Sequence, residues 1–192
     1  MMREAEVRDR LRIRCLQRDA GARTVSEFWV PVSNERVDLA VLGARMTAFE
    51  IKTEFDSLRR LPRQAAAYAR VFEECSVVLA SRHVEKAMQM VPAWWGVLVI
   101  SPDSTFDQVR PAEPNPQIDP ETLVRLLHRS EAEHAIAVSG LDAGLNPGRF
   151  RMWQVLLSEL DTDALQEVVR STLLHRDDLG RPTDQAALTL AS

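Results

Sequence analysis

Cysteine is scarce in this chain: Cys15 and Cys75 are the only two, and no Cys-x-x-Cys spacing occurs. This excludes a disulfide scaffold and a structural zinc site, and it favours a reducing, cytoplasmic environment. Long apolar runs are also missing, because no stretch approaches the roughly 20 apolar residues that span a bilayer. Met1 is followed by a charged run rather than an apolar segment, so we expect no signal peptide. The sequence therefore predicts a cytoplasmic protein without a membrane partner.

An excess of positive charge is absent as well, since 28 acidic residues outweigh 24 lysines and arginines for a formal net charge of -4. This balance does not favour a general nucleic-acid binder, although a local basic face matters more than the total. No P-loop or Rossmann glycine pattern occurs, which argues against a nucleotide-driven function. The four histidines show no metal-ligand spacing, and the serines lack the glycine context of a nucleophile elbow.

Apolar residues make up 45% of the 192 residues, which is enough for a proper core. Hydrophobic spacing predicts an antiparallel meander of three strands followed by two almost wholly apolar strands, over residues 25–32, 37–42, 47–52, 77–80 and 95–100. One helix is expected before these strands, over residues 4–19, and two between them, over residues 58–74 and 83–91. Apolar strands that alternate with helices indicate parallel pairing in an α/β sheet.

The C-terminal part of the chain has a different character. Prolines interrupt the polar stretch 102–120, which lacks periodicity and is typical of a linker. Helices are expected after it, over residues 120–128, 150–160 and 164–174, with N-caps at Asp119 and at Thr162 or Asp163. The tail from about Gly180 is expected to fray. The predicted division is thus a core over 1–101, the linker, and a helical extension over 121–192, through which a homodimer or a larger complex could form.

The most informative residues are Asp38 and, twelve positions later, Glu50 with Lys52. On neighbouring strands of a hairpin this spacing brings the two carboxylates together, and Glu50 and Lys52 share a face because side chains alternate. Charged groups inside apolar strands are costly unless they pair or bind a metal. With the backbone carbonyl of Ile51, the carboxylates form an oxygen-rich site suited to Mg²⁺ or Mn²⁺. A surface salt-bridge ladder is the ordinary alternative.

Residues 36–73, RVDLAVLGARMTAFEIKTEFDSLRRLPRQAAAYARVFE, resemble the signature of the PD-(D/E)XK nuclease superfamily. Asp38 corresponds to the first acid of that signature, Glu50 to the second acid and Lys52 to the motif lysine. Val37 stands where the proline of the pattern would be. The resemblance implies a restriction-endonuclease-like mixed β-sheet flanked by helices, with a helical C-terminal extension.

The resemblance extends to the following helix, where Gln64 and Tyr68 correspond to the Gln-x-x-x-Tyr element of the RecB-type branch. Being four residues apart, they share one helix face. In that branch they imply contacts to the scissile phosphate or to the general base. The alternative is that Tyr68 packs in the core and Gln64 lies at a polar edge. Two distant cysteines cannot supply the iron–sulfur cluster of Cas4-type relatives.

Further candidates lie outside the central motif. The resemblance implies an acid on the first helix that completes the metal site, for which Glu6 is the candidate, with Glu27 on the first strand as a second one. A solvated helix face explains Glu6 equally well. Arg59, Arg60 and Arg63 suit contacts to a DNA backbone, although a charged, solvated helix face is the ordinary explanation.

Together, these features lead us to expect an enzyme: a Mg²⁺- or Mn²⁺-dependent deoxyribonuclease, that is, a hydrolase of phosphodiester bonds, in repair, defence or mobile-element biology. The metal would activate a water molecule and neutralise charge on the phosphodiester, and Lys52 would orient that water. The alternative is a catalytically inactive nuclease fold that binds DNA or acts as a scaffold, which the acidic net charge favours slightly.

Overall fold

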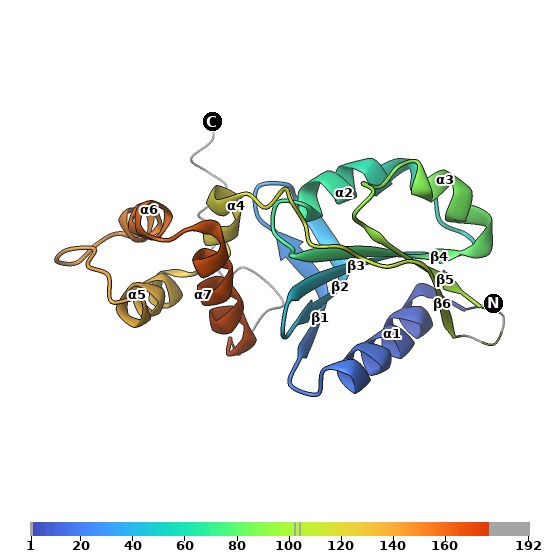
Figure 1. Ribbon diagram of the computed structural model, residues 1–192, viewed down its shortest axis with the longest axis horizontal. Coiled ribbons are helices and arrows are strands. Elements are labelled where there is room, and N and C mark those ends of the chain that lie inside the picture. Colours follow the sequence, from blue (N-terminus) through green and yellow to red (C-terminus); the bar gives the residue numbers. More distant parts are fainter. Residues whose placement is uncertain (1, 102, 104, 177–192) are drawn as a thin grey trace.

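The computed structural model describes residues 2–101, 103 and 105–176 and shows an α/β fold with one mixed six-stranded sheet (Figure 1). The strands lie in chain order across the sheet: β1 (Arg23–Val30), β2 (Glu35–Leu42), β3 (Met46–Lys52), β4 (Glu74–Ala80), β5 (Gly96–Ile100) and β6 (Phe106–Arg110). β1, β2 and β3 form the predicted antiparallel meander, β3, β4 and β5 pair in parallel, and β6 pairs antiparallel with β5. The predicted α/β class is therefore confirmed.

Helices cover both faces and one side of the sheet. They are α1 (Glu4–Arg18), α2 (Leu61–Tyr68), α3 (Val84–Met88), α4 (Pro120–Val124), α5 (Arg129–Val138), α6 (Arg149–Glu159) and α7 (Thr162–Leu174). Figure 1 shows α1 below the sheet and α2 with α3 above it. Within the described part of the chain, no helix combines the length and the apolar character that crossing a membrane requires.

Helix α1 packs on its face of the sheet through a narrow apolar stripe. Val7 and Leu11 are fully buried there, in one cluster with Leu39, Ile51 and Val78 from the sheet. The spacing of four residues places Val7 and Leu11 on the same side of the helix. Asp9 and Arg10 between them are exposed, so α1 is amphipathic as the sequence predicts.

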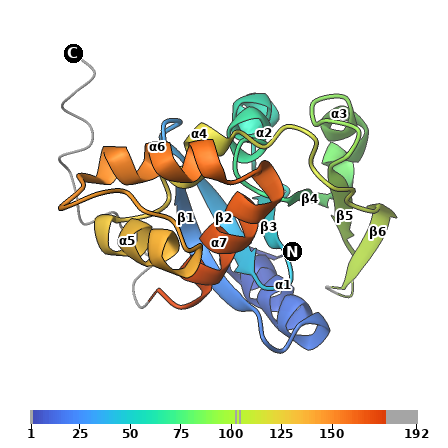
Figure 2. The ribbon, with the colours of Figure 1, turned by 60° about the vertical axis from the view of Figure 1, so that its left-hand side comes forward.

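The C-terminal helices α4–α7 gather at the β1 and β2 side of the sheet (Figures 1 and 2). Their buried residues, such as Leu123 and Val169, belong to the same hydrophobic cluster as the upper face of the sheet. A polar contact adds to this packing: Arg170 on α7 donates to both carboxylate oxygens of Glu73, at 2.7 and 2.9 Å. Glu73 also accepts from the Met46 N–H at 2.7 Å, which ties α7 to the start of β3.

Within the expected linker, Phe106–Arg110 form β6 rather than a loop. β6 is an edge strand whose residues are mostly exposed, so its sequence has no apolar periodicity. Further along, the Asn115 side chain donates to the carbonyls of Ala69 and Phe72, at 2.6 and 2.7 Å. These bonds satisfy carbonyls that follow α2 and fasten the segment to the sheet domain.

Other differences from the expected elements are smaller. The helix expected over 58–74 ends as an α-helix at Tyr68, and β4 already begins at Glu74. Helix α5 was missed because its buried face consists largely of alanines, which give little hydrophobic signal. The cap of α7 is Asp161, which accepts from the Ala164 N–H at 2.8 Å, rather than either residue expected. The tail predicted from Gly180 lies outside the described residues.

Candidate functional site

A side chain replaces the backbone partner where the pairing of β2 and β3 stops. The last pair of that ladder is Leu39 opposite Phe49. Beyond it, the N–H of Ile51 on β3 donates to Oδ2 of Asp38 on β2, at 2.7 Å. This bond fixes the Asp38 carboxylate at the junction of the two strands. The role expected for the Ile51 carbonyl as a metal ligand stays a prediction.

The carboxylate of Glu50 is fully buried between β3 and α2. Its Oε1 accepts from the Lys52 ammonium at 2.6 Å, and its Oε2 lies 2.6 Å from the Tyr68 hydroxyl. The same hydroxyl lies 2.6 Å from the Arg36 carbonyl, yet a phenol has one proton to donate. The Tyr68 hydroxyl can therefore donate to only one of these two oxygens at a time. Burial raises the pKa of Glu50, while the Lys52 charge opposes that rise.

Asp38 is a second carboxyl group with an unusual proton affinity. Burial, followed by the negative charge of Glu50, raises the pKa of Asp38 to about 8, although the Ile51 N–H and the Lys52 charge oppose the shift. Two buried carboxylates that repel each other do not both ionise readily near neutral pH. An added cation would favour the ionised forms, which is the electrostatic condition of a metal site.

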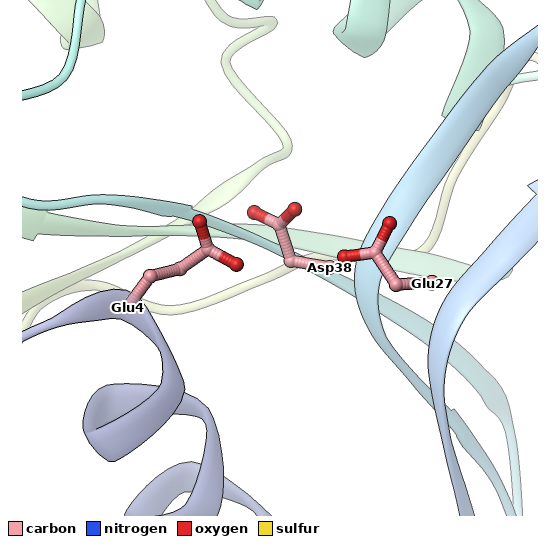
Figure 3. A group of neighbouring side chains, drawn as sticks. All are labelled: Glu4, Glu27 and Asp38. Atoms are coloured by element: carbon pink, nitrogen blue, oxygen red, sulfur yellow. The ribbon is translucent and has the colours of Figure 1, made fainter.

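Three carboxylates converge between α1 and the sheet (Figure 3). Glu4 comes from the first turn of α1, Glu27 from β1 and Asp38 from β2, and one oxygen of each lies within 4.8 Å of the others. Glu27 has a φ of 55°, in the left-handed region that a residue with a side chain rarely adopts. Such strain needs support from the surrounding structure and is common at functional positions.

Gln64 and Tyr68 lie on the same face of α2, as their spacing predicts, and both lie beside Glu50. Tyr68 is fully buried and Gln64 is 3% exposed. A hydrogen bond from the Gln64 side chain helps to lower the pKa of Glu50 against the effect of burial. The Gln64 Oε1 atom is buried and, among the described residues, has no hydrogen-bond partner. A buried acceptor without a partner is costly, so the Gln64 oxygen lacks a hydrogen-bond donor beside Glu50.

The acid that the first helix contributes is Glu4, whereas the sequence analysis named Glu6. Glu6 is exposed, and its Oε2 accepts from the Arg3 N–H at the start of α1, at 2.8 Å. Glu4 lies on the stripe of Val7 and Leu11, because three and seven residues separate it from them. That stripe faces the sheet, so helical spacing alone could have predicted that Glu4 rather than Glu6 points towards the sheet.

The arginines expected to contact DNA lie around another buried acid. Arg60 Nη2 lies 3.0 Å from Glu35 Oε2, and Arg63 Nε lies 2.5 Å from Glu35 Oε1, with the Glu35 side chain fully buried. These two arginines therefore offset the charge of Glu35, which sequence analysis missed. Arg59 is exposed, and its own N–H donates to the Ser57 hydroxyl.

The chain belongs to a family named after a bacteriophage protein. The family model for Bacteriophage P4 protein cII matches residues 3–180, so the chain belongs to that family. Protein cII of Enterobacteria phage P4 is 25% identical over 158 residues, which cover 81% of this chain and 60% of that protein. The chain thus matches less than two thirds of the length of this relative. No solved structure matches, and the restriction-endonuclease-like form of the sheet stays a prediction.

Membership of this family contradicts the expected placement in the PD-(D/E)XK superfamily. The expectation of a nuclease, a phosphodiester hydrolase and hence an enzyme rested on that resemblance and falls with it. The physical reason lies in the spacing itself. Pairing in a hairpin and the turn of the next helix bring Asp38, Glu50, Lys52, Gln64 and Tyr68 together whatever their chemistry, so their order in the chain is no evidence of turnover.

Proposed function

We propose that this protein binds a divalent cation, Mg²⁺ or Mn²⁺, between Glu4, Glu27 and Asp38, and binds DNA through that cation without a chemical step. The observation that carries the proposal is the convergence of three carboxylate oxygens, from three separate elements, within 4.8 Å of one another. A set of hard oxygen ligands is the type that these two cations prefer.

The charges around the cluster support a cation. The pKa values of Asp38 and of neighbouring Glu50 are both raised by burial, so each group gains from an added positive charge. Metal affinity should therefore increase as the pH rises towards about 8, where Asp38 loses its proton. Next to Glu50, the Oε1 atom of Gln64 is a buried acceptor without a partner among the described residues.

DNA suits this site because a Mg²⁺ or Mn²⁺ ion held by a few carboxylates keeps positions for water and phosphate oxygens. The chain has a formal net charge of -4, so general attraction to DNA is weak and the cation must offset local repulsion. We therefore expect DNA affinity to depend on the cation far more than it does for a basic DNA-binding protein.

The test combines calorimetry with Mn²⁺ and fluorescence anisotropy of a labelled DNA duplex, in Mn²⁺ and in EDTA. Loss of a group that only orients a metal ligand commonly costs about 10–100-fold in metal affinity, so loss of the ligand itself in Asp38→Asn should cost at least about tenfold. Glu133→Gln is the matched control, because Glu133 is an exposed acid on α5 that pairs with Arg129 at 3.0 Å. It should leave both affinities unchanged.

Two results would refute the proposal. One is the absence of saturable Mn²⁺ binding by the wild-type protein at pH 8. The other is DNA affinity that is the same in Mn²⁺ and in EDTA, which would separate any DNA binding from the carboxylate cluster.

A further inference from the structure

Two arginines already occupy the carboxylates that the proposed cation would need. Arg8 Nη1 lies 3.2 Å from Glu27 Oε1 and 3.5 Å from Glu4 Oε1. Arg36 Nη1 lies 3.9 Å from Glu27 Oε2. Both oxygens of Glu27 therefore face a guanidinium, and Arg8 bridges α1 and β1 across the mouth of the cluster.

A cation and these guanidiniums compete for the same oxygens. A metal ion bound by Glu4 and Glu27 withdraws negative charge from Arg8 and Arg36, and the ion itself repels both side chains. The ion pairs are weak enough to exchange, because the Glu27 side chain is 47% exposed and that of Arg36 is 65% exposed. Arg8 is more enclosed, with 22% of its side chain exposed, so it is the stronger competitor.

We infer that cation binding releases Arg8 and Arg36 from Glu4 and Glu27, and that the released guanidiniums bind DNA phosphates beside the cation. This inference rests on the proposed function and names two residues of its DNA surface and the device that exposes them. Guanidinium groups match phosphate oxygens in geometry and charge. The two arginines lie on α1 and β2 and border the same cluster, so they would hold phosphates next to the metal.

A second observation, beside the neighbouring Glu50, is independent of the acidic cluster. Gln64, 3% exposed, belongs to the hydrogen-bond set of Glu50, and its Oε1 lacks a partner within the described residues. Glu50 in turn is coupled electrostatically to Asp38. A buried acceptor beside Glu50 is thus open to a donor such as a metal-bound water molecule, while the exchangeable arginines pair with Glu4 and Glu27.

The first test measures the affinity of Mn²⁺ for the full chain by calorimetry at low salt. Arg8→Gln removes the competitor, so Mn²⁺ should bind about 1.5- to fivefold more tightly, the range expected for the loss of a partly exposed ion pair. The matched control is Arg12→Gln, one turn further along α1, where Arg12 pairs with Asp9 at 3.6 Å away from the cluster. Unchanged or weaker Mn²⁺ binding in Arg8→Gln would overturn the inference.

The second test measures how DNA affinity falls with salt, in Mn²⁺ and in EDTA. Each phosphate contact contributes about 0.9 to the slope of log affinity against log salt concentration. Arg8→Gln should lower this slope by about 0.9 in Mn²⁺ and leave it unchanged in EDTA, whereas Arg12→Gln should leave both slopes as in the wild type. An equal loss of slope in Mn²⁺ and in EDTA would mean that Arg8 contacts DNA without release and would refute the coupling.

The measurements distinguish a failure of the proposed metal binding from a failure of the arginine release. If wild-type protein binds no Mn²⁺, the proposed function fails and the release of arginines fails with it. If the wild type binds Mn²⁺ and DNA together but Arg8→Gln behaves like Arg12→Gln in both tests, only the inference about the arginines is refuted.

Discussion

Replacing Tyr68 by phenylalanine removes one oxygen atom from the centre of the candidate site. That oxygen lies 2.6 Å from the Arg36 carbonyl and 2.6 Å from Glu50 Oε2. The ring itself stays packed, stacked on Trp95 with centroids 6.1 Å apart and edge-on to Phe72 at 6.3 Å. The substitution therefore leaves the volume of the core almost unchanged and isolates the hydroxyl.

The expected cost follows from the one hydrogen bond that this hydroxyl can donate. A buried acceptor left without a partner costs about 1–3 kcal/mol. Glu50 keeps Lys52 as a partner, so we expect the free energy of unfolding to fall by about 1–3 kcal/mol. For a protein of this length that corresponds to a decrease in melting temperature of about 2–12 °C.

Calorimetric melting of Tyr68→Phe, Glu50→Gln and the double variant forms a thermodynamic cycle. Because the two side chains are in contact, their effects should not be additive, with a coupling of about 1 kcal/mol or more. Additive effects, or a loss of less than about 0.5 kcal/mol in Tyr68→Phe, would refute the view that this hydroxyl holds Glu50 and β2 together.

Two more outcomes can be checked by chemical denaturation. In EDTA, the free energy of unfolding should fall as the pH rises from about 4 to about 8, because the folded state keeps the Asp38 proton (pKa about 8) that the unfolded chain loses near pH 4. Asp38→Asn should flatten this profile, and an unchanged slope would contradict the raised pKa. Gly96→Ala should destabilise by about 1–3 kcal/mol, because the new methyl group would lie 3.0 Å from the Ala112 nitrogen and closer still to Ser76. Gly148→Ala is its control, since nothing lies within 4 Å of the added atom there, and equal losses in both variants would refute the packing argument.

Sequence patterns predicted the structure correctly where the structural signal is local. The stripe of Val7 and Leu11 predicted α1, and the wholly apolar strands predicted parallel pairing. The clustering of Asp38, Glu50 and Lys52 was equally accessible, because one hairpin connects the strands that carry them. The resemblance based on the same residues misled us about family and activity, since hairpin geometry produces this spacing without regard to chemistry.

The sequence by itself determined the α/β class, the meander and the parallel strands, because hydrophobic period and turn residues act over a few positions. Only the tertiary structure decided that Glu4 joins Asp38, and that Arg60 and Arg63 offset the charge of Glu35. It also decided that Arg8 bridges Glu4 and Glu27. These contacts join separate elements, so they depend on how helices pack against the sheet, and local sequence patterns carry little information about that packing.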